Sequence, residues 1–181
     1  MGVAGAGSKV NRIIVFGNSG SGKSTLAARL CREHTLAHLD LDPLAWLPTD
    51  PPQRRPLEDC DAALEQFLSA HTSWVIEGCY ADLLARVVPQ ATQAIFLNLP
   101  VAACQDNARR RPWEPHKYAS REAQDANLPM LLAWIADYTQ RDDVLSLRAH
   151  RALFEAFPGR KREITDNDAL WGLSDDEPTG R

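Results

Sequence analysis

Residues 17–24 read Gly-Asn-Ser-Gly-Ser-Gly-Lys-Ser, and this stretch decides the fold. It follows an apolar run at residues 13–16, Ile-Ile-Val-Phe, and leads into residues 25–30, which favour a helix. A buried strand, a glycine-rich loop and a helix form the context in which the pattern GxxxxGK[ST] makes a phosphate-binding P-loop. Glycines let backbone N–H groups approach a phosphate, and the helix N-terminus attracts the same anion. The stretch therefore predicts nucleoside triphosphate binding.

Two side chains of this motif carry specific roles. The Lys23 ammonium can reach the outer phosphates of ATP, and the Ser24 hydroxyl can bind Mg²⁺. The alternative, a glycine-rich turn that binds nothing, requires the fixed spacing and its flanking strand and helix to have arisen by chance. We therefore expect ATP and Mg²⁺ as cofactors. The predicted nucleotide-binding residues are Gly17, Asn18, Ser19, Gly20, Ser21, Gly22, Lys23, Ser24 and Thr25.

The composition is that of a globular protein. The chain has 181 residues, enough for one domain with a substantial core, and 44% of them are hydrophobic. The net charge of −4 argues weakly against a large nucleic-acid surface. No apolar run reaches membrane-spanning length, and residues 1–11 lack the apolar core of a signal peptide. The four cysteines are widely spaced without a CxxC pair, which favours reduced thiols. These features predict a cytoplasmic protein that contacts no membrane.

Apolar runs alternate with helical patterns along the rest of the chain. The expected strands after the first are residues 37–40, 73–78, 94–99 and 162–165. The expected helices are residues 57–68, 81–88, 101–111, 120–137 and 147–157, with Pro129 either kinking the fourth of these or starting a new helix. We predict residues 1–10 as a flexible leader, 11–172 as one domain and 173–181 as a flexible tail. The alternation predicts an α/β fold with a five-stranded parallel sheet covered on both faces.

Polar residues follow each expected strand, and ligands sit at this edge of parallel sheets. Besides the P-loop, these residues are Asp40, Asp42, Glu77, Asn98 and Asp166. Asp40 and Asp42 are two residues apart where a strand ends, so extended backbone points both side chains the same way. An ordinary Asp-Pro turn is the alternative explanation for this pair.

Asp40, Asp42 and Glu77 can divide the duties that phosphoryl transfer requires. Transfer to an alcohol needs Mg²⁺ to neutralise phosphate charge and a carboxylate to orient or deprotonate the acceptor. We expect Asp40 near the metal and Asp42 as the acceptor base or orienter. Glu77 is expected to hold a water on Mg²⁺, with an ordinary strand-end carboxylate as the alternative. The predicted metal site is therefore Ser24, Asp40 and Glu77.

Three consecutive arginines, Arg109, Arg110 and Arg111, end a predicted helix just before two prolines. They can complement the helix dipole. Alternatively, they belong to a lid that closes over ATP and brings a guanidinium to the transferring phosphoryl group. We name Arg109 and Arg111 as catalytic candidates, beside Lys23 and Asp42.

Other candidates belong to an acceptor site. Arg54 and Arg55 lie in the proline-rich connection at residues 48–56, which is either an acceptor-binding segment or a solvated loop. The aromatic residues in expected loops, which could line an acceptor pocket, are Trp46, Trp113 and Tyr118. His34 and His38 have i,i+4 spacing, but they straddle a helix end and a strand start, so we expect no metal site there.

The first 111 residues resemble the small P-loop kinases typified by adenylate kinase, shikimate kinase and gluconate kinase. Residues 17–24 match the phosphate loop of that group. Asp40-Leu41-Asp42 is similar to the D-x-D of shikimate kinase, which implies a metal role for the first Asp and an acceptor role for the second. Glu77-Gly78 stands where adenylate kinase has Asp-Gly, and Arg111-Pro112 resembles the start of an arginine-bearing lid.

Residues 38–46 and 74–80 are also similar to adenylate-kinase-related proteins, some of them called DNA topology modulation proteins. The resemblance implies a P-loop NTPase fold of three α/β/α layers, like that of nucleoside monophosphate kinases, with a helical lid insertion over residues 109–160. It implies ATP and Mg²⁺ but no particular acceptor. The Asp-Gly-Phe-Pro-Arg run of adenylate kinase and the triple-glycine loop of shikimate kinase are both absent.

We therefore expect transfer of the γ-phosphoryl of ATP to a hydroxyl or phosphate of a small-molecule acceptor. One alternative is a nucleotide-dependent ATPase or switch protein that binds a macromolecular partner through residues 112–160. Another is a nucleic-acid end kinase that uses the basic clusters at residues 109–111 and 160–162. The acidic total charge argues against nucleic acid as a partner.

Overall fold

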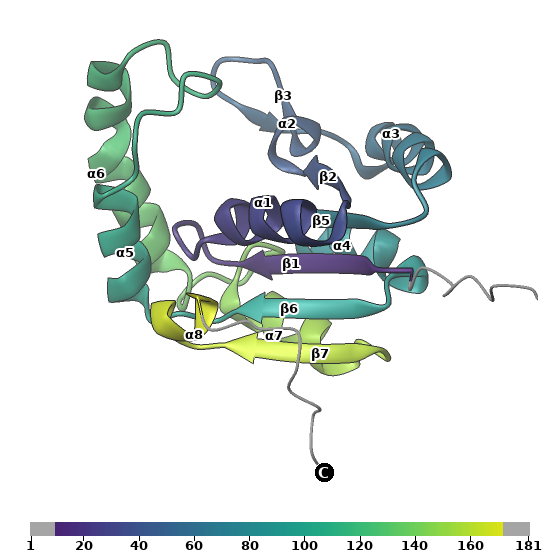
Figure 1. The fold of residues 1–181 in the computed structure, drawn as a ribbon. Helices are drawn as coiled ribbons and strands as arrows, with labels where there is room; N and C mark the ends of the chain where they lie inside the picture. The colour runs from purple at the N-terminus through teal and green to yellow at the C-terminus, as the bar shows by residue number, and fades with distance from the viewer. Residues whose placement is uncertain (1–9, 172–181) are drawn as a thin grey trace, which may run out of the picture.

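The computed structural model describes residues 10–171, and a five-stranded parallel sheet forms its centre (Figure 1). The strands of this sheet are β1 (Arg12–Gly17), β2 (Ala37–Asp40), β5 (Trp74–Gly78), β6 (Gln93–Leu97) and β7 (Arg160–Ile164). They lie in the order β2-β5-β1-β6-β7, and every neighbouring pair is parallel. The predicted α/β fold with its five-stranded parallel sheet is confirmed. Apart from Val10, the predicted leader and tail lie outside the described residues.

Helices cover both faces of the sheet. Their bounds are α1 (Lys23–His34), α3 (Leu57–Ala70), α4 (Ala81–Val87), α5 (Val101–Arg109), α6 (Arg121–Asp137), α7 (Leu147–Ala156) and α8 (Asn167–Trp171), and the short 3₁₀ turn η1 (Val88–Gln90) follows α4. Alternation along β1 divides the core between the two layers. Ile14 and Phe16 pack with residues of α3, α4 and α7, whereas Ile13 and Val15 pack with residues of α1, α5, α6 and α8. All four side chains are buried, as expected for a parallel strand covered on both sides.

The proline-rich connection between β2 and α3 contains structure that the sequence analysis did not predict. It holds α2 (Asp42–Ala45) and a small antiparallel pair, β3 (Trp46–Leu47) with β4 (Gln53–Arg54). Leu41 and Ala45 are fully buried in the core on the α3 side of the sheet, which fixes α2 against the domain. Two residues are too few for a recognisable strand period, so the sequence pattern does not reveal this hairpin.

Helix α6 continues through Pro129 without interruption. A proline inside a helix costs about 3 kcal/mol because it removes one backbone donor and crowds the preceding turn. Leu128, Leu131 and Leu132 pack against the core, and Ile135 is fully buried there. Residues on both sides of Pro129 therefore pack against the same hydrophobic cluster. Packing of the apolar face therefore outweighs the cost of Pro129.

Helices α5 and α6 stand side by side at the P-loop end of the sheet (Figure 1). Residues 110–120 connect them, and we call this stretch the lid segment. The short helix α8, which the sequence analysis did not predict, ends the described chain beside the P-loop. Within residues 10–171, none of the helices combines the length and the apolarity that crossing a membrane requires.

Candidate active site

The P-loop connects β1 to α1, and Gly20 and Gly22 show why it needs glycine. Gly22 precedes α1 with φ +91°, and Gly20 has φ +76°. Both values lie in the left-handed region that L side chains rarely adopt. A Cβ on Gly20 would also lie 2.3 Å from the carbonyl oxygen of Cys104, so α5 leaves no room for a side chain. The loop therefore presents bare backbone to the cleft, as phosphate binding requires.

Side-chain amides tie this loop to three helices. Asn18 Nδ2 donates to the Ile135 carbonyl on α6 at 3.0 Å, and Asn18 is buried. Asn107 Nδ2 on α5 donates to the Gly20 carbonyl at 2.9 Å. Asn107 and Asn167 of α8 also exchange amide hydrogen bonds of 3.0 and 3.1 Å. The sequence analysis missed Asn107 and Asn167, because an asparagine inside a helix carries no signal that points to a distant loop.

Lys23 and Ser24 each donate a hydrogen bond to a neighbouring oxygen. The Lys23 ammonium donates to the Asn18 carbonyl within the loop at 2.7 Å. The Ser24 hydroxyl donates to Glu77 Oε1 at 2.8 Å. Glu77 is 2% exposed at the end of β5, so this hydroxyl and a neighbouring His38 compensate for its burial.

His38 and Asp40 flank this carboxylate on β2. His38 Nε2 lies 3.4 Å from Glu77 Oε1, and the hydrogen bond to that carboxylate raises the pKa of His38, although burial opposes it. Burial, together with the charges of Asp42 and Glu77, raises the pKa of Asp40. Asp40 Oδ1 accepts the backbone N–H of Asp42 at 2.8 Å, so Asp40 supports the turn into α2.

A cleft of about 630 Å³ opens in front of the P-loop. Of the predicted site residues, it is lined by Ser19, Gly20, Gly22, Lys23, Ser24, Thr25, Asp42, Glu77, Arg111 and Tyr118. The sequence analysis did not name Glu114, Lys117, Asn107 or Asn167, which line it too. Asp40 is not part of the lining. The pairing of Asp40 with the backbone of Asp42 explains why the two carboxylates do not both reach the cleft.

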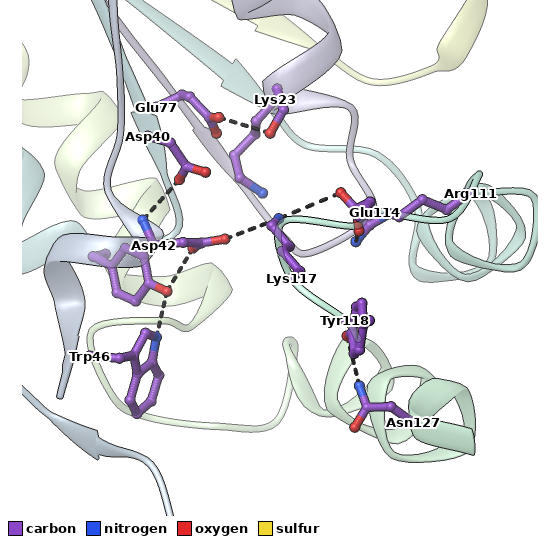
Figure 2. Close-up of polar contacts among 12 residues, drawn as sticks. Lys23, Asp40, Asp42, Trp46, Glu77, Arg111, Glu114, Lys117, Tyr118 and Asn127 are labelled. Atoms are coloured by element: carbon purple, nitrogen blue, oxygen red, sulfur yellow. Dashed lines mark hydrogen bonds and ion pairs between the residues drawn. The ribbon is translucent and has the colours of Figure 1, made fainter. Parts of the chain in front are cut away.

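A chain of opposite charges links Asp42 to the lid segment (Figure 2). Lys117 Nζ lies 3.4 Å from Asp42 Oδ2 and 3.6 Å from Glu114 Oε1. Arg111 Nη1 lies 3.2 Å from Glu114 Oε2. Burial alone would lower the pKa of Lys117, but the carboxylates of Asp42 and Glu114 outweigh it, and the pKa is raised. Lys117 therefore favours its charged form on the Asp42 side of the cleft.

On its other side, Asp42 is held by aromatic residues. The Tyr80 hydroxyl donates to Asp42 Oδ1 at 2.7 Å, and the Trp46 indole donates to the Tyr80 oxygen at 2.7 Å. The Arg54 guanidinium lies 4.9 Å from the centre of the Tyr80 ring and 3.0 Å from Asp82 Oδ2. Burial, with the nearby Cys79 and Asp42, raises the pKa of Tyr80, so its hydroxyl stays protonated.

The side chains of the three consecutive arginines point in different directions, because successive residues are rotated about the helix axis. Arg110 and Arg111 line the cleft, whereas Arg109 does not. Arg109 Nη1 is 2.8 Å from Asp106 Oδ1 on the exposed side of α5. Of the two catalytic candidates among the arginines, the structure therefore brings Arg111 to the site and leaves Arg109 outside it.

Most other acceptor-site candidates have structural partners. Arg55 donates to the carbonyls of Leu44 and Trp46, and neither Arg54, Arg55, Trp46 nor Trp113 lines the cleft. Tyr118 does line it, and Asn127 donates to its hydroxyl at 2.9 Å. At the sheet edge, Asn98 donates to Glu163 at 2.9 Å, and Asp166 accepts the backbone N–H of Ala169 at 2.6 Å.

A buried histidine contacts the backbone of a residue that lines the cleft. His150 of α7 is 0% exposed and lies edge-on to Phe16 and Phe96. Its Nε2 is 2.8 Å from the Cys79 carbonyl, which only accepts, so Nε2 carries the proton and Nδ1 accepts from the Tyr138 hydroxyl at 2.7 Å. Burial lowers the pKa of His150 to about 4. The neutral ring thus links the cleft loop at Cys79 to the end of α6.

These features define a P-loop nucleotide-binding domain: a parallel sheet, a glycine-rich loop after β1, and a cleft in front of that loop. The same assignment follows from sequence comparison. The chain belongs to the AAA_18 family, described as an AAA domain, whose family model matches residues 13–127. No curated protein matches the sequence significantly.

Two similar solved structures bear the names of kinases. A sugar kinase from Janibacter sp. HTCC2649 is 15% identical, with 90% of each chain covered and a TM-score of 0.51. A gluconokinase from Sinorhizobium meliloti 1021 is 16% identical, with 89% of this chain and 85% of that chain covered and a TM-score of 0.52. At these identities the likeness establishes the fold, and it agrees with the expected resemblance to small P-loop kinases.

Proposed function

We propose that this protein is an ATP-dependent phosphotransferase that moves the γ-phosphoryl of ATP to a hydroxyl or phosphate of a small-molecule acceptor. The observation that carries the proposal is the cleft, in which the P-loop and the Asp42 carboxylate face the same space. Two structures of similar fold bear the names sugar kinase and gluconokinase, which supports the same class of reaction.

The residues divide into a nucleotide side and an acceptor side. The P-loop amides and Lys23 would hold the β- and γ-phosphates, exchanging the Asn18 carbonyl for phosphate oxygens. Arg111 would bring positive charge to the transferring group, because its pairing with Glu114 places it at the cleft. Asp42 would orient the acceptor hydroxyl and take its proton.

Magnesium fits the oxygen donors beside the P-loop. Among residues 10–171, no group of three or more His, Cys, Asp or Glu side chains could hold a metal. Mg²⁺ in phosphoryl-transfer sites needs few protein ligands, because phosphates and waters supply the rest. Ser24 Oγ and Glu77 Oε1, 2.8 Å apart at the cleft, are hard oxygen donors of the required kind. Bound Mg²⁺ would neutralise phosphate charge, and Asp40, which lies beside Glu77 on the neighbouring strand, would add negative charge near it.

A thermal-shift screen tests the proposal and identifies the acceptor. The protein is heated with Mg²⁺, a non-hydrolysable ATP analogue and a metabolite library, and ADP release is then measured with ATP and each hit. A ligand at a hundredfold its Kd stabilises the fold by about 2.7 kcal/mol, which is readily visible. Lys23→Ala should retain the fold and lose most nucleotide stabilisation and turnover. Full activity in Lys23→Ala would contradict the assignment.

The same assays separate the rival functions. Acceptor-independent hydrolysis of ATP, together with a macromolecular partner retained only in the presence of ATP, would indicate a nucleotide-dependent switch. Nucleic-acid binding that weakens steeply with salt would indicate an end kinase.

A further inference from the structure

The two carboxylate oxygens of Asp42 have different kinds of partner. Oδ1 accepts a 2.7 Å hydrogen bond from the Tyr80 hydroxyl, inside the domain. Oδ2 faces the Lys117 ammonium of the lid segment at 3.4 Å. The side chain of Asp42 is 43% exposed, and both Asp42 and Lys117 line the cleft. One oxygen is therefore held by the core, and the other is held by a side chain on the cleft.

The direction of the Tyr80 hydrogen bond is fixed by its neighbours. An indole N–H can only donate, so the 2.7 Å contact from Trp46 requires the Tyr80 oxygen to accept. The one proton of the Tyr80 hydroxyl must then go to Asp42. Tyr80 is 3% exposed, and Arg54 lies over both the Tyr80 and the Trp46 rings. This packing gives Tyr80 a single orientation.

Lys117 is held less firmly. Its ion pair with Asp42 is long and partly exposed, a type of contact worth about 0–1 kcal/mol. Glu114 lies 3.6 Å from the same ammonium, so Lys117 keeps a partner when it leaves Asp42. While the contact lasts, the ammonium occupies one lone pair through which Asp42 Oδ2 would accept a proton, and its charge disfavours protonation of that oxygen.

We propose that Tyr80 is a positioning residue that keeps Asp42 Oδ2 directed at the cleft, and that Lys117 masks this oxygen until an acceptor displaces it. The proposal rests on the proposed phosphotransfer function. The consequence of this masking is that the enzyme hydrolyses little ATP when no acceptor is bound. When Lys117 no longer masks Asp42, a water oxygen bonds to the γ-phosphorus. The bond between the γ-phosphorus and the β–γ bridging oxygen then breaks. ADP leaves with that electron pair, and Asp42 Oδ2 takes the water proton, giving ADP and inorganic phosphate.

The test measures ADP release from ATP and Mg²⁺ without any acceptor, at saturating ATP. Lys117→Met should raise the rate by about fivefold, the equivalent of one exposed ion pair. Lys117→Arg, which keeps the positive charge, should retain the low rate of the unaltered protein. Lys161→Met is the matched control, because Lys161 lies on the edge strand β7 outside the cleft, and its rate should not change.

Second substitutions in the Lys117→Met background test the positioning role. Adding Tyr80→Phe should lower the raised rate again while leaving the KM for ATP unchanged, since the nucleotide contacts are intact. Adding Asp42→Asn should abolish the increase. A purely structural role of these residues predicts slower turnover in every variant, so opposite effects of Lys117→Met and Tyr80→Phe distinguish the two explanations.

Nucleotide binding, measured by thermal shift with a non-hydrolysable ATP analogue, separates the possible failures. If nucleotide does not stabilise the unaltered protein, the proposed function is wrong, and the mask is wrong with it. If nucleotide binds but Lys117→Met is no faster, the mask is wrong and the proposed function stands. If Lys117→Met is faster but Tyr80→Phe has no effect in that background, Tyr80 does not position Asp42.

Discussion

At the scale of single residues, two P-loop glycines differ in the space that their surroundings leave for a side chain. Gly20 and Gly22 both have positive φ, but their environments differ. A Cβ on Gly20 would collide with the Cys104 carbonyl at 2.3 Å, whereas a Cβ on Gly22 would meet only Leu170, at an ordinary contact distance of 3.5 Å. Gly20 is therefore constrained by packing as well as by backbone conformation.

This difference predicts unequal costs for two alanine substitutions. Gly20→Ala should lower the free energy of unfolding by about 1–3 kcal/mol more than Gly22→Ala, because it adds a backbone collision to the same left-handed strain. Chemical denaturation of both variants, compared with the unaltered protein, measures the difference. Equal destabilisation by the two substitutions would show that α5 yields to the added atom.

The chemistry-bearing residues were predictable from sequence to different degrees. Lys23, Ser24 and Glu77 line the cleft as expected, because a motif and a strand end fixed their places. Tyr80 and Lys117 were not recognised as site residues, since their roles depend on partners 38 and 75 positions away. Local pattern indicates which backbone reaches the site, but it does not reveal a side chain that arrives from a distant loop.

At the scale of elements, the P-loop is held by helices α5, α6 and α8. The bond from Asn107 to the Gly20 carbonyl is the link from α5. Gln105 on the same helix donates instead to the Leu132 carbonyl of α6, at 3.0 Å. The two amides can be compared, because each links α5 to a neighbouring segment and only Asn107 touches the loop. Asn107 differs in that it also exchanges two hydrogen bonds with Asn167 of α8.

Asn107→Ala should therefore weaken nucleotide binding, and Gln105→Ala should not. Gln105→Ala should lose about 0.5–1.5 kcal/mol of stability, the net worth of one hydrogen bond, and Asn107→Ala should lose more, because it also breaks the bonds to Asn167. Only Asn107→Ala should also show a smaller thermal shift with a non-hydrolysable ATP analogue, because the Gly20 carbonyl is no longer fixed. A full nucleotide shift in Asn107→Ala would mean that the loop holds its shape without α5.

Strands and long helices followed from sequence because their apolar periods are long enough to recognise. β7 begins at Arg160 rather than at the expected residue 162, since exposed basic residues mark its start and conceal the pairing with β6. The hairpin of β3 and β4 escaped prediction because strands of two residues show no alternation, and α8 escaped it because five residues barely exceed one helical turn. Tertiary contacts, rather than local propensity, stabilise these short elements.

At the scale of the whole molecule, His150 couples the packing of the core to pH. It joins α7 to the Cys79 carbonyl and to Tyr138 at the end of α6. Its pKa falls from 6.5 to about 4, chiefly through burial, with Lys23 lowering it further and Asp143 and the Cys79 hydrogen bond opposing this. The folded state therefore binds the proton less readily than the unfolded chain does.

This pKa predicts a loss of stability in acid. Above pH 6.5 both states are neutral and the full contribution of His150 is present. Between pH 6.5 and about 4 the unfolded chain takes up a proton that the folded protein does not, so stability falls by up to about 3 kcal/mol. His150→Gln should flatten this part of the profile of unfolding free energy against pH. An unchanged slope in that variant would assign the acid sensitivity to other groups.

The position of α8 has a consequence for the order in which the protein matures during synthesis. Asn167 and Leu170 adjoin the loop that follows the first strand, so residues near both ends of the described chain complete one pocket. A nascent chain that ends before α8 already contains all five strands of the sheet but not the finished pocket. Nucleotide can then assist only the final step of folding, and premature termination before residue 167 should give a protein that is largely assembled yet unable to retain ATP.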